Sequence, residues 1–229
     1  MKQRSKLVFI VPIIVGIVCV VIFAAPSGAQ DNATTAVDAK IATIELTELT
    51  AKEVEGILFM RQEEKLARDV YWVIYNKWGV RIFKNIANSE QTHMDALARI
   101  VTRYGLDDPI SEEIPGTFPN DTLQLLYKEL VERAGKSFND ALIVGAQIEE
   151  LDIDDLERWL AATDNEDVRI VYQNLMKGSR NHLRSFYRQI ERSNLKYTPS
   201  YLSADTFNLI VTSPRERGGA ILDPDYIFE

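Results

Sequence analysis

The chain contains only two histidines, His93 and His182, and each follows a polar residue by three positions. Glu90 precedes His93, and Ser179 precedes His182. Side chains three positions apart lie on one face of a helix, so a Glu and a His at this spacing can bind the same metal ion. Pairs of this kind hold metal ions in the interior of four-helix bundles. The spacing therefore predicts metal chemistry, although it identifies no substrate.

Polar residues interrupt the apolar stripes of all four long predicted helices near their midpoints. Antiparallel packing would bring these interruptions to about the same level. Carboxylates in an apolar interior are costly and repel one another unless something compensates them. A divalent or trivalent cation would do so, and Glu with His is the ligand set expected for iron, manganese or zinc. The candidate metal ligands are Glu64, Glu90, His93, Glu149 and His182.

The alternative to a metal site is a hydrogen-bonded polar layer with protonated glutamates and charged histidines. We favour metal because the polar positions coincide and include both histidines. On the first long helix, either Glu63 or Glu64 could be the ligand, since Glu63 also has apolar neighbours. We prefer Glu64. The next acid along the third long helix, Glu150, is expected on its polar face. A solvated face is likewise expected for Asp152, Asp154 and Asp155.

The first 29 residues have the pattern of a targeting segment. Basic residues precede an apolar run over residues 7–25, and small residues follow it at 27–29. This pattern predicts a signal peptide cleaved near Ala29, and a retained membrane anchor over 7–25 is the alternative. Both predict an exported, extracytoplasmic domain. Cys19 lies within this segment, so the remaining domain has no thiol for a disulfide or an iron–sulfur cluster.

The composition excludes some partners. The chain has 26 basic and 34 acidic residues, and removing residues 1–29 leaves a net charge of −11. Nucleic acid is therefore not expected as a partner, whereas metal cations would be attracted to such a surface.

The elements that must position the candidate ligands are all predicted to be helical. Helices are expected at about 51–78, 81–104 and 121–133, then from 138 to a turn near 163–165, followed by a fourth long helix. This gives two antiparallel helical hairpins joined by a long crossover over 105–136, the ferritin-like variant of the four-helix bundle. Residues 30–50 are expected to form a linker, 51–202 the bundle, and 203–229 a mostly non-helical tail.

Several segments resemble known families. Residues 63–71, Glu-Glu-Lys-Leu-Ala-Arg-Asp-Val-Tyr, resemble the first-helix motif of rubrerythrins, in which Ala-Arg and then Tyr follow a metal-binding Glu. Glu90-x-x-His93 and Glu149 are similar to the second- and third-helix motifs of that ferritin-like superfamily. More closely, residues 51–202 resemble an uncharacterised ferritin-like family, the domain of unknown function numbered 2202. The likeness is carried by residues 63–71, by Ser89-Glu90 with His93-Met94, and by Gly178-Ser179 with Asn181-His182-Leu183.

The resemblance implies a ferritin-like fold with one or two iron ions, or manganese or zinc in their place. Ser179 departs from the pattern, because the superfamily has a second Glu there; a single-metal or asymmetric site is therefore expected. Ser179, Tyr71 and Arg68 are the residues expected to support the ligands. Tyr71 is either a hydrogen-bond donor or redox relay, or simply part of the core. Arg68 is either such a support or one half of a surface ion pair with Glu64.

The function expected from these residues is metal-dependent oxidation or reduction with oxygen or peroxide as substrate. Rubrerythrins carry a cysteine-bound iron domain that relays electrons, and no cysteine follows residue 29 here. An external electron donor would therefore be required. The alternatives are metal sequestration without turnover, or a metal-free helical interaction module of the cell envelope.

Overall fold

The computed structural model describes residues 28–229. The predicted signal or anchor segment, with Cys19, lies almost wholly outside the described residues. Within them the chain is all-helical, with seven helices and no strand. The helices are α1 (Gly28–Ile41), α2 (Ala51–Trp78), α3 (Arg81–Arg103), α4 (Asp121–Ala134), α5 (Phe138–Ala161), α6 (Glu166–Arg192) and α7 (Ala204–Thr212).

Local sequence signals set the ends of the long helices. Thr50 and Glu53 form a reciprocal capping box at the start of α2, and Gly79 ends that helix in the left-handed conformation at φ 70°. Ser137 caps α5 by accepting a hydrogen bond from the Asp140 backbone N–H. These caps place the helix boundaries within a residue or two of those predicted from the sequence.

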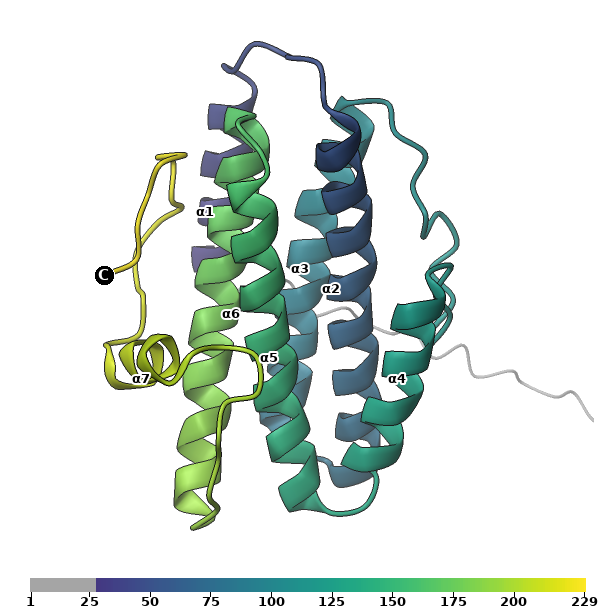
Figure 1. Cartoon of the computed structure of the whole chain (residues 1–229), viewed down its shortest axis with the longest axis vertical. Coiled ribbons are helices and arrows are strands. Elements are labelled where there is room, and N and C mark those ends of the chain that lie inside the picture. The colour runs from purple at the N-terminus through teal and green to yellow at the C-terminus, as the bar shows by residue number, and fades with distance from the viewer. Residues whose placement is uncertain (1–27) are drawn as a thin grey trace, which may run out of the picture.

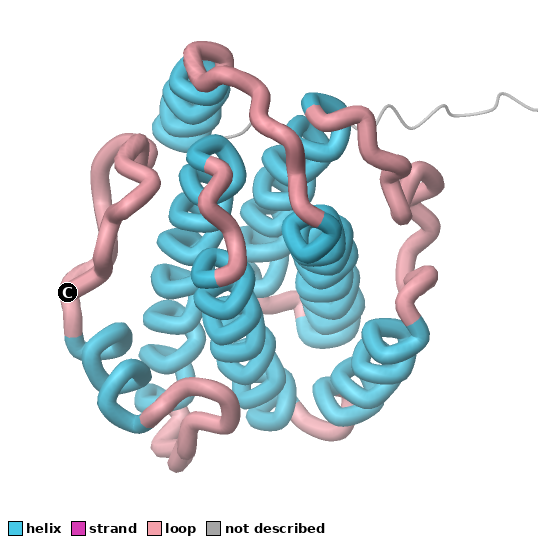
Figure 2. Tube along the Cα trace, turned by 45° about the horizontal axis from the view of Figure 1, so that its top comes forward, coloured by secondary structure: helices cyan, strands magenta, loops and turns pink. Residues whose placement is uncertain are grey.

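Four long helices, α2, α3, α5 and α6, lie side by side along the long axis of the molecule (Figure 1). α2 packs against α3 and α5 packs against α6, so each hairpin forms through neighbours in sequence. The hairpins meet through contacts of α2 with α5 and of α3 with α6. The crossover between them contains α4, which packs on the outer side of α2 and α5 (Figure 2).

Two shorter helices were not expected. The predicted linker over residues 30–50 contains α1, which lies along α6 (Figure 1). Val37 of α1 is buried, and Lys40 pairs with Glu166 at 2.7 Å. In the predicted tail, residues 204–212 form α7, capped by Ser203, and the rest of residues 203–229 is non-helical.

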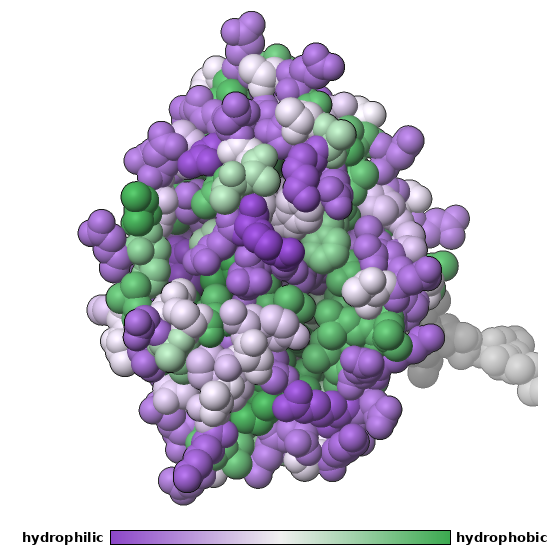
Figure 3. All heavy atoms as spheres, in the orientation of Figure 1, coloured by the Kyte–Doolittle hydropathy of each residue, from purple (hydrophilic) through white to green (hydrophobic). Residues whose placement is uncertain are grey.

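The core is made by the inward faces of the long helices, with α4, α7 and part of α1 covering its edges. The surface is mostly hydrophilic on the face that Figure 3 shows, with apolar side chains in small groups between polar ones. In the described part of the chain, no helix is both long enough and apolar enough to cross a bilayer.

Candidate metal centre

The five predicted ligands meet in the interior at mid-helix. We call Glu64, Glu90, His93, Glu149 and His182 the Glu/His centre. α2 supplies Glu64, α3 supplies Glu90 and His93, α5 supplies Glu149, and α6 supplies His182. The three glutamates are between 1% and 2% exposed and His93 is 7% exposed. Helical periodicity puts each residue on the inward face of its helix, which explains this convergence.

The donor atoms form two groups that share Glu90. One group is Glu64, Glu90 and His93, and the other is Glu90, Glu149 and His182; in each, the donor atoms lie within 4.8 Å of one another. His93 Nδ1 is 3.1 Å from Glu64 Oε2 and 2.8 Å from Glu90 Oε2. His182 Nδ1 is 3.0 Å from Glu90 Oε1 and 3.3 Å from Glu149 Oε2. Each histidine therefore directs the same ring nitrogen toward two carboxylates.

These separations suit metal ligands. Two donor atoms that each bind one ion at about 2.1 Å, at right angles, lie about 3 Å apart. Glu90 Oε1 and His182 Nδ1 are at that separation, yet neither makes a hydrogen bond of acceptable geometry with any described residue. Glu64 Oε1 is also buried without a partner. Buried polar atoms are normally hydrogen-bonded, so the leftover atoms fit a cation between them.

The pKa values of the glutamates and histidines in the centre depart strongly from their usual ranges. Burial raises the pKa of Glu64 and of Glu149 to about 7, although the adjacent histidines act in the opposite direction. Burial would also raise the pKa of Glu90, but the charges of His182 and His93 hold it below its usual range. Against the effect of burial, Glu90 and Glu149 raise the pKa of His182 to about 10. Without metal, the two imidazoles are the cations that offset the carboxylates.

His93 fits into the centre because residue 178 on the facing helix α6 is glycine. A Cβ atom at this position would lie 2.4 Å from His93 Nε2 and 2.6 Å from His93 Cε1. Contacts that short do not occur, so any other residue at 178 would displace the imidazole or α6. Gly178 thus fixes how closely the ring approaches α6.

Tyr71 of α2 donates a hydrogen bond to Glu149, one of the two roles that the sequence left open for it. Its hydroxyl lies within hydrogen-bond distance of Glu149 Oε1 and of the Gly145 carbonyl oxygen, the latter at 3.2 Å. The side chain is fully buried and packs on Phe83 and Phe186. A carboxylate oriented in this way has one oxygen directed toward Tyr71 and the other toward His182.

Ser179 does not face the centre as a ligand. Its hydroxyl donates to Asp152 Oδ2, and it is also 3.0 Å from the Leu175 carbonyl oxygen. Asp152 is 5% exposed, so its predicted place on a solvated face is wrong. It lies three positions after Glu149, on the same face of α5, and that spacing could have identified it. The side chain lies outside both donor groups, although burial and the charge of Glu64 raise its pKa.

Glu63 and Glu150, the acidic neighbours of two predicted ligands, are both buried, and only for Glu150 does this differ from the expectation. Glu63 is as buried as Glu64, and both of its oxygens lack a hydrogen-bond partner among the described residues. Glu150 is fully buried rather than on a polar surface, because residues 197–202 cover it. Its Oε2 accepts hydrogen bonds from the backbone N–H groups of Ser200 and Tyr201 at 2.9 and 3.0 Å. Glu149 faces the centre as predicted, and Glu150 faces the tail.

Arg68 pairs with residues other than Glu64, so the ion pair considered as an alternative for Arg68 is not present. It contacts Asp69 at 2.9 Å and Glu113 of the crossover at 2.6 Å. Lys65 is fully buried beside it and pairs with Asp69 at 2.6 Å. We call Lys65, Arg68, Asp69 and Glu113 the α2 ion-pair network. It joins α2 to the crossover, and Arg68 also donates a hydrogen bond to Gln91 of α3, next to Glu90 in sequence. Arg68 forms no ion pair with Glu64.

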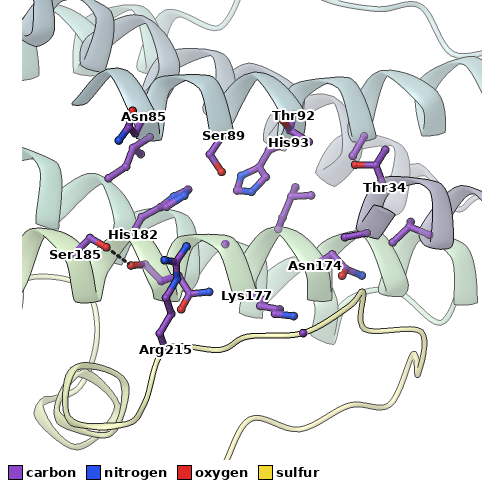
Figure 4. A pocket seen from close by; sticks show the side chains of 18 of the residues that line it. Thr34, Asn85, Ser89, Thr92, His93, Asn174, Lys177, His182, Ser185 and Arg215 are labelled. Carbon is purple, nitrogen blue, oxygen red and sulfur yellow. Dashed lines mark hydrogen bonds between the residues drawn. The ribbon is translucent and has the colours of Figure 1, made fainter. Parts of the chain in front are cut away.

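The histidines also line a groove between α3 and α6. Figure 4 shows His93 and His182 projecting toward this groove from the two helices, with Ser89 nearby. The groove has a volume of about 760 Å³. Since both Nδ1 atoms face the carboxylates, the opposite edges of the rings separate the groove from the Glu/His centre.

Comparisons with known proteins agree on the family. Residues 53–214 match the family model described as an uncharacterized protein domain, DUF2202. The chain is 53% identical over 170 residues to the uncharacterized protein MJ0754 of Methanocaldococcus jannaschii, covering 74% of this chain and 92% of that protein. It is also similar to the crystal structure of hypothetical protein MJ0754, with a TM-score of 0.75 and 50% identity, over 76% of this chain and 99% of that one. By these matches the chain belongs to the DUF2202 family of uncharacterised domains.

Proposed function

We propose that this chain is an exported, ferritin-like metal-binding protein that uses iron or manganese to reduce oxygen or peroxide. The arrangement proposed for α2, α3, α5 and α6 is a ferritin-like four-helix bundle, with each hairpin contributing ligands. Glu64, Glu90, His93, Glu149 and His182 would hold the ion or ions. The observation that carries the proposal is the pair of three-residue donor groups sharing Glu90, with buried oxygen and nitrogen atoms left without hydrogen bonds.

The residues of the chain have separate tasks in this proposal. A bound iron or manganese ion would supply the change of oxidation state and the affinity for an oxygen species. Glu90 joins the two donor groups, and Tyr71 orients Glu149. The apolar walls around these side chains exclude water and strengthen every electrostatic interaction inside. No cysteine is present among residues 28–229, so the electrons must come from an external donor.

The number of ions depends on α6, where Ser179 replaces the glutamate of the superfamily pattern. With five ligands and three carboxylates, one well-bound ion or an asymmetric pair is the expected state. Asp152 provides a further buried carboxyl group next to Ser179. Moving the carboxyl group from α5 to α6, by Ser179→Glu with Asp152→Ser, creates a Glu-x-x-His pair on α6. We expect that exchange to increase the metal bound per chain; unchanged or lower content would argue against this geometry.

The experiment is to measure metal content on full-length protein without a histidine tag. The protein is reconstituted anaerobically with iron(II) or manganese(II), desalted, and analysed by plasma mass spectrometry. We expect between one and two equivalents, lost in Glu149→Gln and retained in Glu150→Gln. These variants are matched, because both carboxylates are buried at consecutive positions of α5 and only Glu149 faces the histidines. Equal loss in both would contradict the assignment.

A second measurement separates catalysis from sequestration. The loaded protein is mixed with ascorbate, and oxygen or hydrogen peroxide consumption is followed with an electrode. Turnover that disappears in Glu149→Gln supports the oxidoreductase. Stable metal binding without turnover supports sequestration. Absence of metal in every preparation would reject both and leave the metal-free interaction module.

Gly178→Ala offers a test that substitutes none of the predicted ligands. The added Cβ would clash with His93, so we expect metal affinity to fall by at least about tenfold. Gly219→Ala is the control, because a Cβ there would have no neighbour within 4 Å. If Gly178→Ala binds metal as tightly as the unmodified protein, His93 is not a ligand in the position described.

A further inference from the structure

The groove between α3 and α6 has an unusual distribution of charge. Its lining includes five basic residues and neither aspartate nor glutamate. The whole chain, in contrast, carries more acidic than basic residues, 34 against 26. The basic residues come from three parts of the fold: α3, α6 and the tail after α7. They are Arg99, Lys177, Arg188, Arg192 and Arg215.

Most of this positive charge is unpaired within the described residues. Arg99 forms an ion pair with Asp38 at 2.8 Å. Arg188 contacts only the Arg184 carbonyl oxygen and Ser185, and Arg215 has no ion pair with any described residue. Glu216, next to Arg215 in sequence, is already engaged by Arg180 and Arg184 at 2.6 and 3.0 Å. The groove therefore has cations that no internal carboxylate neutralises.

Aliphatic side chains complete the groove. Ile82 and Ile86 of α3 and Val171 and Leu175 of α6 line it. Since α6 rises about 1.5 Å per residue, Val171 and Leu175 lie toward the end of the groove away from Arg188. Figure 4 shows Lys177 and Arg215 close to α6 and to the tail, on the side of the groove opposite His93. A concave surface of one charge sign focuses the electric field and concentrates counter-ions. A volume of about 760 Å³ also lies within the range of small-molecule sites, about 300–1,000 Å³.

We infer that this groove binds a small organic anion, with its charged group at Arg188 and Arg215 and its apolar body against Ile82 and Ile86 of α3. Such a ligand would rest against the outer edge of His182. The inference goes beyond the proposed function and does not require metal in the protein, because it depends only on groove shape and charge.

The test uses two fluorescent probes with the same rings. 8-Anilinonaphthalene-1-sulfonate carries one negative charge, and N-phenyl-1-naphthylamine is its neutral counterpart. Each is titrated into full-length protein, both metal-free and metal-loaded. We expect one equivalent of the sulfonate to bind to both forms, at least tenfold more tightly than the neutral probe. Affinity for the sulfonate should fall when salt is raised, because salt screens exposed charges.

Variants place the binding in the groove. Arg188→Gln and Arg215→Gln should each weaken sulfonate binding about fivefold and leave the neutral probe unaffected. Arg217→Gln is the control, since Arg217 is an exposed residue of the same tail that does not line the groove. Arg192→Gln serves as a further groove variant if one of the others fails to fold, as judged by circular dichroism.

Equal affinity for the two probes would overturn the inference, as would equal losses in Arg215→Gln and Arg217→Gln. Each result is independent of the metal centre. Sulfonate binding without any metal content would leave the groove assignment standing and reject the proposed function. Metal binding without a preference for the sulfonate over the neutral probe would reject the groove assignment and leave the proposed function standing.

Discussion

Two buried polar regions share helix α2, and their charges are balanced in different ways. In the α2 ion-pair network, Asp69 accepts hydrogen bonds or ion pairs from Lys65, Arg68 and the Gly116 backbone N–H. The charges there are matched by the chain itself. In the Glu/His centre, the carboxyl groups of Glu64, Glu90 and Glu149 lie against two imidazoles, and two more buried carboxyl groups, those of Glu63 and Asp152, are on the same helices. Even with both histidines protonated, three carboxyl groups remain unmatched.

This difference distinguishes a network with a structural role from a centre that is suited to bind a cation. Buried ion pairs that are complete within the chain need nothing further and serve to join α2 to the crossover. The Glu/His centre is incomplete, because buried oxygens of Glu64 and Glu90 lack hydrogen bonds. Since isolated buried charges are expensive, such a region must either take up protons or bind a cation. Substitutions in the two regions should therefore have different effects: those in the network should lower stability, and those in the Glu/His centre should lower metal affinity.

The largest effect is expected for Asp69→Ala. Removing this carboxylate leaves Lys65 and Arg68 buried without their shared partner, at a cost of about 3–5 kcal/mol of unfolding free energy. Urea denaturation of the metal-free protein measures it. Metal content per folded chain should stay the same, because the network is separate from the ligands. A loss below about 1 kcal/mol would show that the crossover does not depend on this pairing.

Glu53, at the start of α2, is a well-paired carboxylate and should stabilise the fold in a pH-dependent way. Burial would raise its pKa, but hydrogen bonds from Asn165, Thr163 and Thr50 lower it from 4.5 to about 2. The folded protein therefore binds this proton less readily than the unfolded chain. Its contribution, up to about 3 kcal/mol, is present above pH 4.5 and is lost as the pH falls toward 2.

Glu53→Gln should accordingly destabilise the protein at pH 7 and make little difference near pH 2. Denaturation curves measured from pH 2 to pH 7 test this, with the exposed Glu55→Gln as control. A difference between the variant and the unmodified protein that does not change with pH would contradict the role assigned to the carboxylate.

Glu63, on the same helix, should show the opposite sign. Burial raises its pKa well above 4.5, and the charge of Asp152 adds to the shift. The folded protein then holds this proton more tightly than the unfolded chain, so the carboxyl group costs stability as the pH rises above 4.5. Glu63→Gln should stabilise the metal-free protein by about 1–2 kcal/mol at pH 8 and by less at pH 5. Thermal denaturation at the two pH values measures the gain, and a loss at pH 8 would mean that Glu63 is paired.

The smallest effect concerns one hydrogen bond to a ligand. Tyr71→Phe removes the donor to Glu149, which should lower metal affinity by about tenfold. Tyr172→Phe is the matched control, because the Tyr172 hydroxyl is buried and has no hydrogen-bond partner among the described residues. Competition with a chelator measures both affinities. If the two variants behave alike, Tyr71 is only a core residue.

The fold could be predicted where its signals are local. The capping box at Thr50, the left-handed Gly79 and the Ser137 cap each act within one helical turn, so the sequence places these ends directly. α1 has no such clear signal. Its contacts are with residues far away in sequence, such as the Lys40 pair with Glu166, and only the folded structure brings them together.

The convergence of the five candidate ligands was predictable for a similar reason. Each of them interrupts an apolar stripe, and helical periodicity makes an interruption visible. Glu150 and Asp152 were misplaced because their burial comes from other segments: residues 197–202 cover Glu150, and Ser179 of α6 meets Asp152. Periodicity along one helix shows which residues share a face. It does not show which segment later covers that face.

The division of the donor groups between the hairpins has a consequence for how the protein assembles. Glu64, Glu90 and His93 all belong to α2 and α3, which are joined by a short turn, so this group is complete once the first hairpin forms. The second group combines Glu90 with residues of α5 and α6 and cannot exist until the hairpins dock. If the amino-terminal hairpin forms first, it therefore holds a partial site already. Under the proposed function, an ion bound there would attract Glu149 and His182 and so favour docking of the second hairpin.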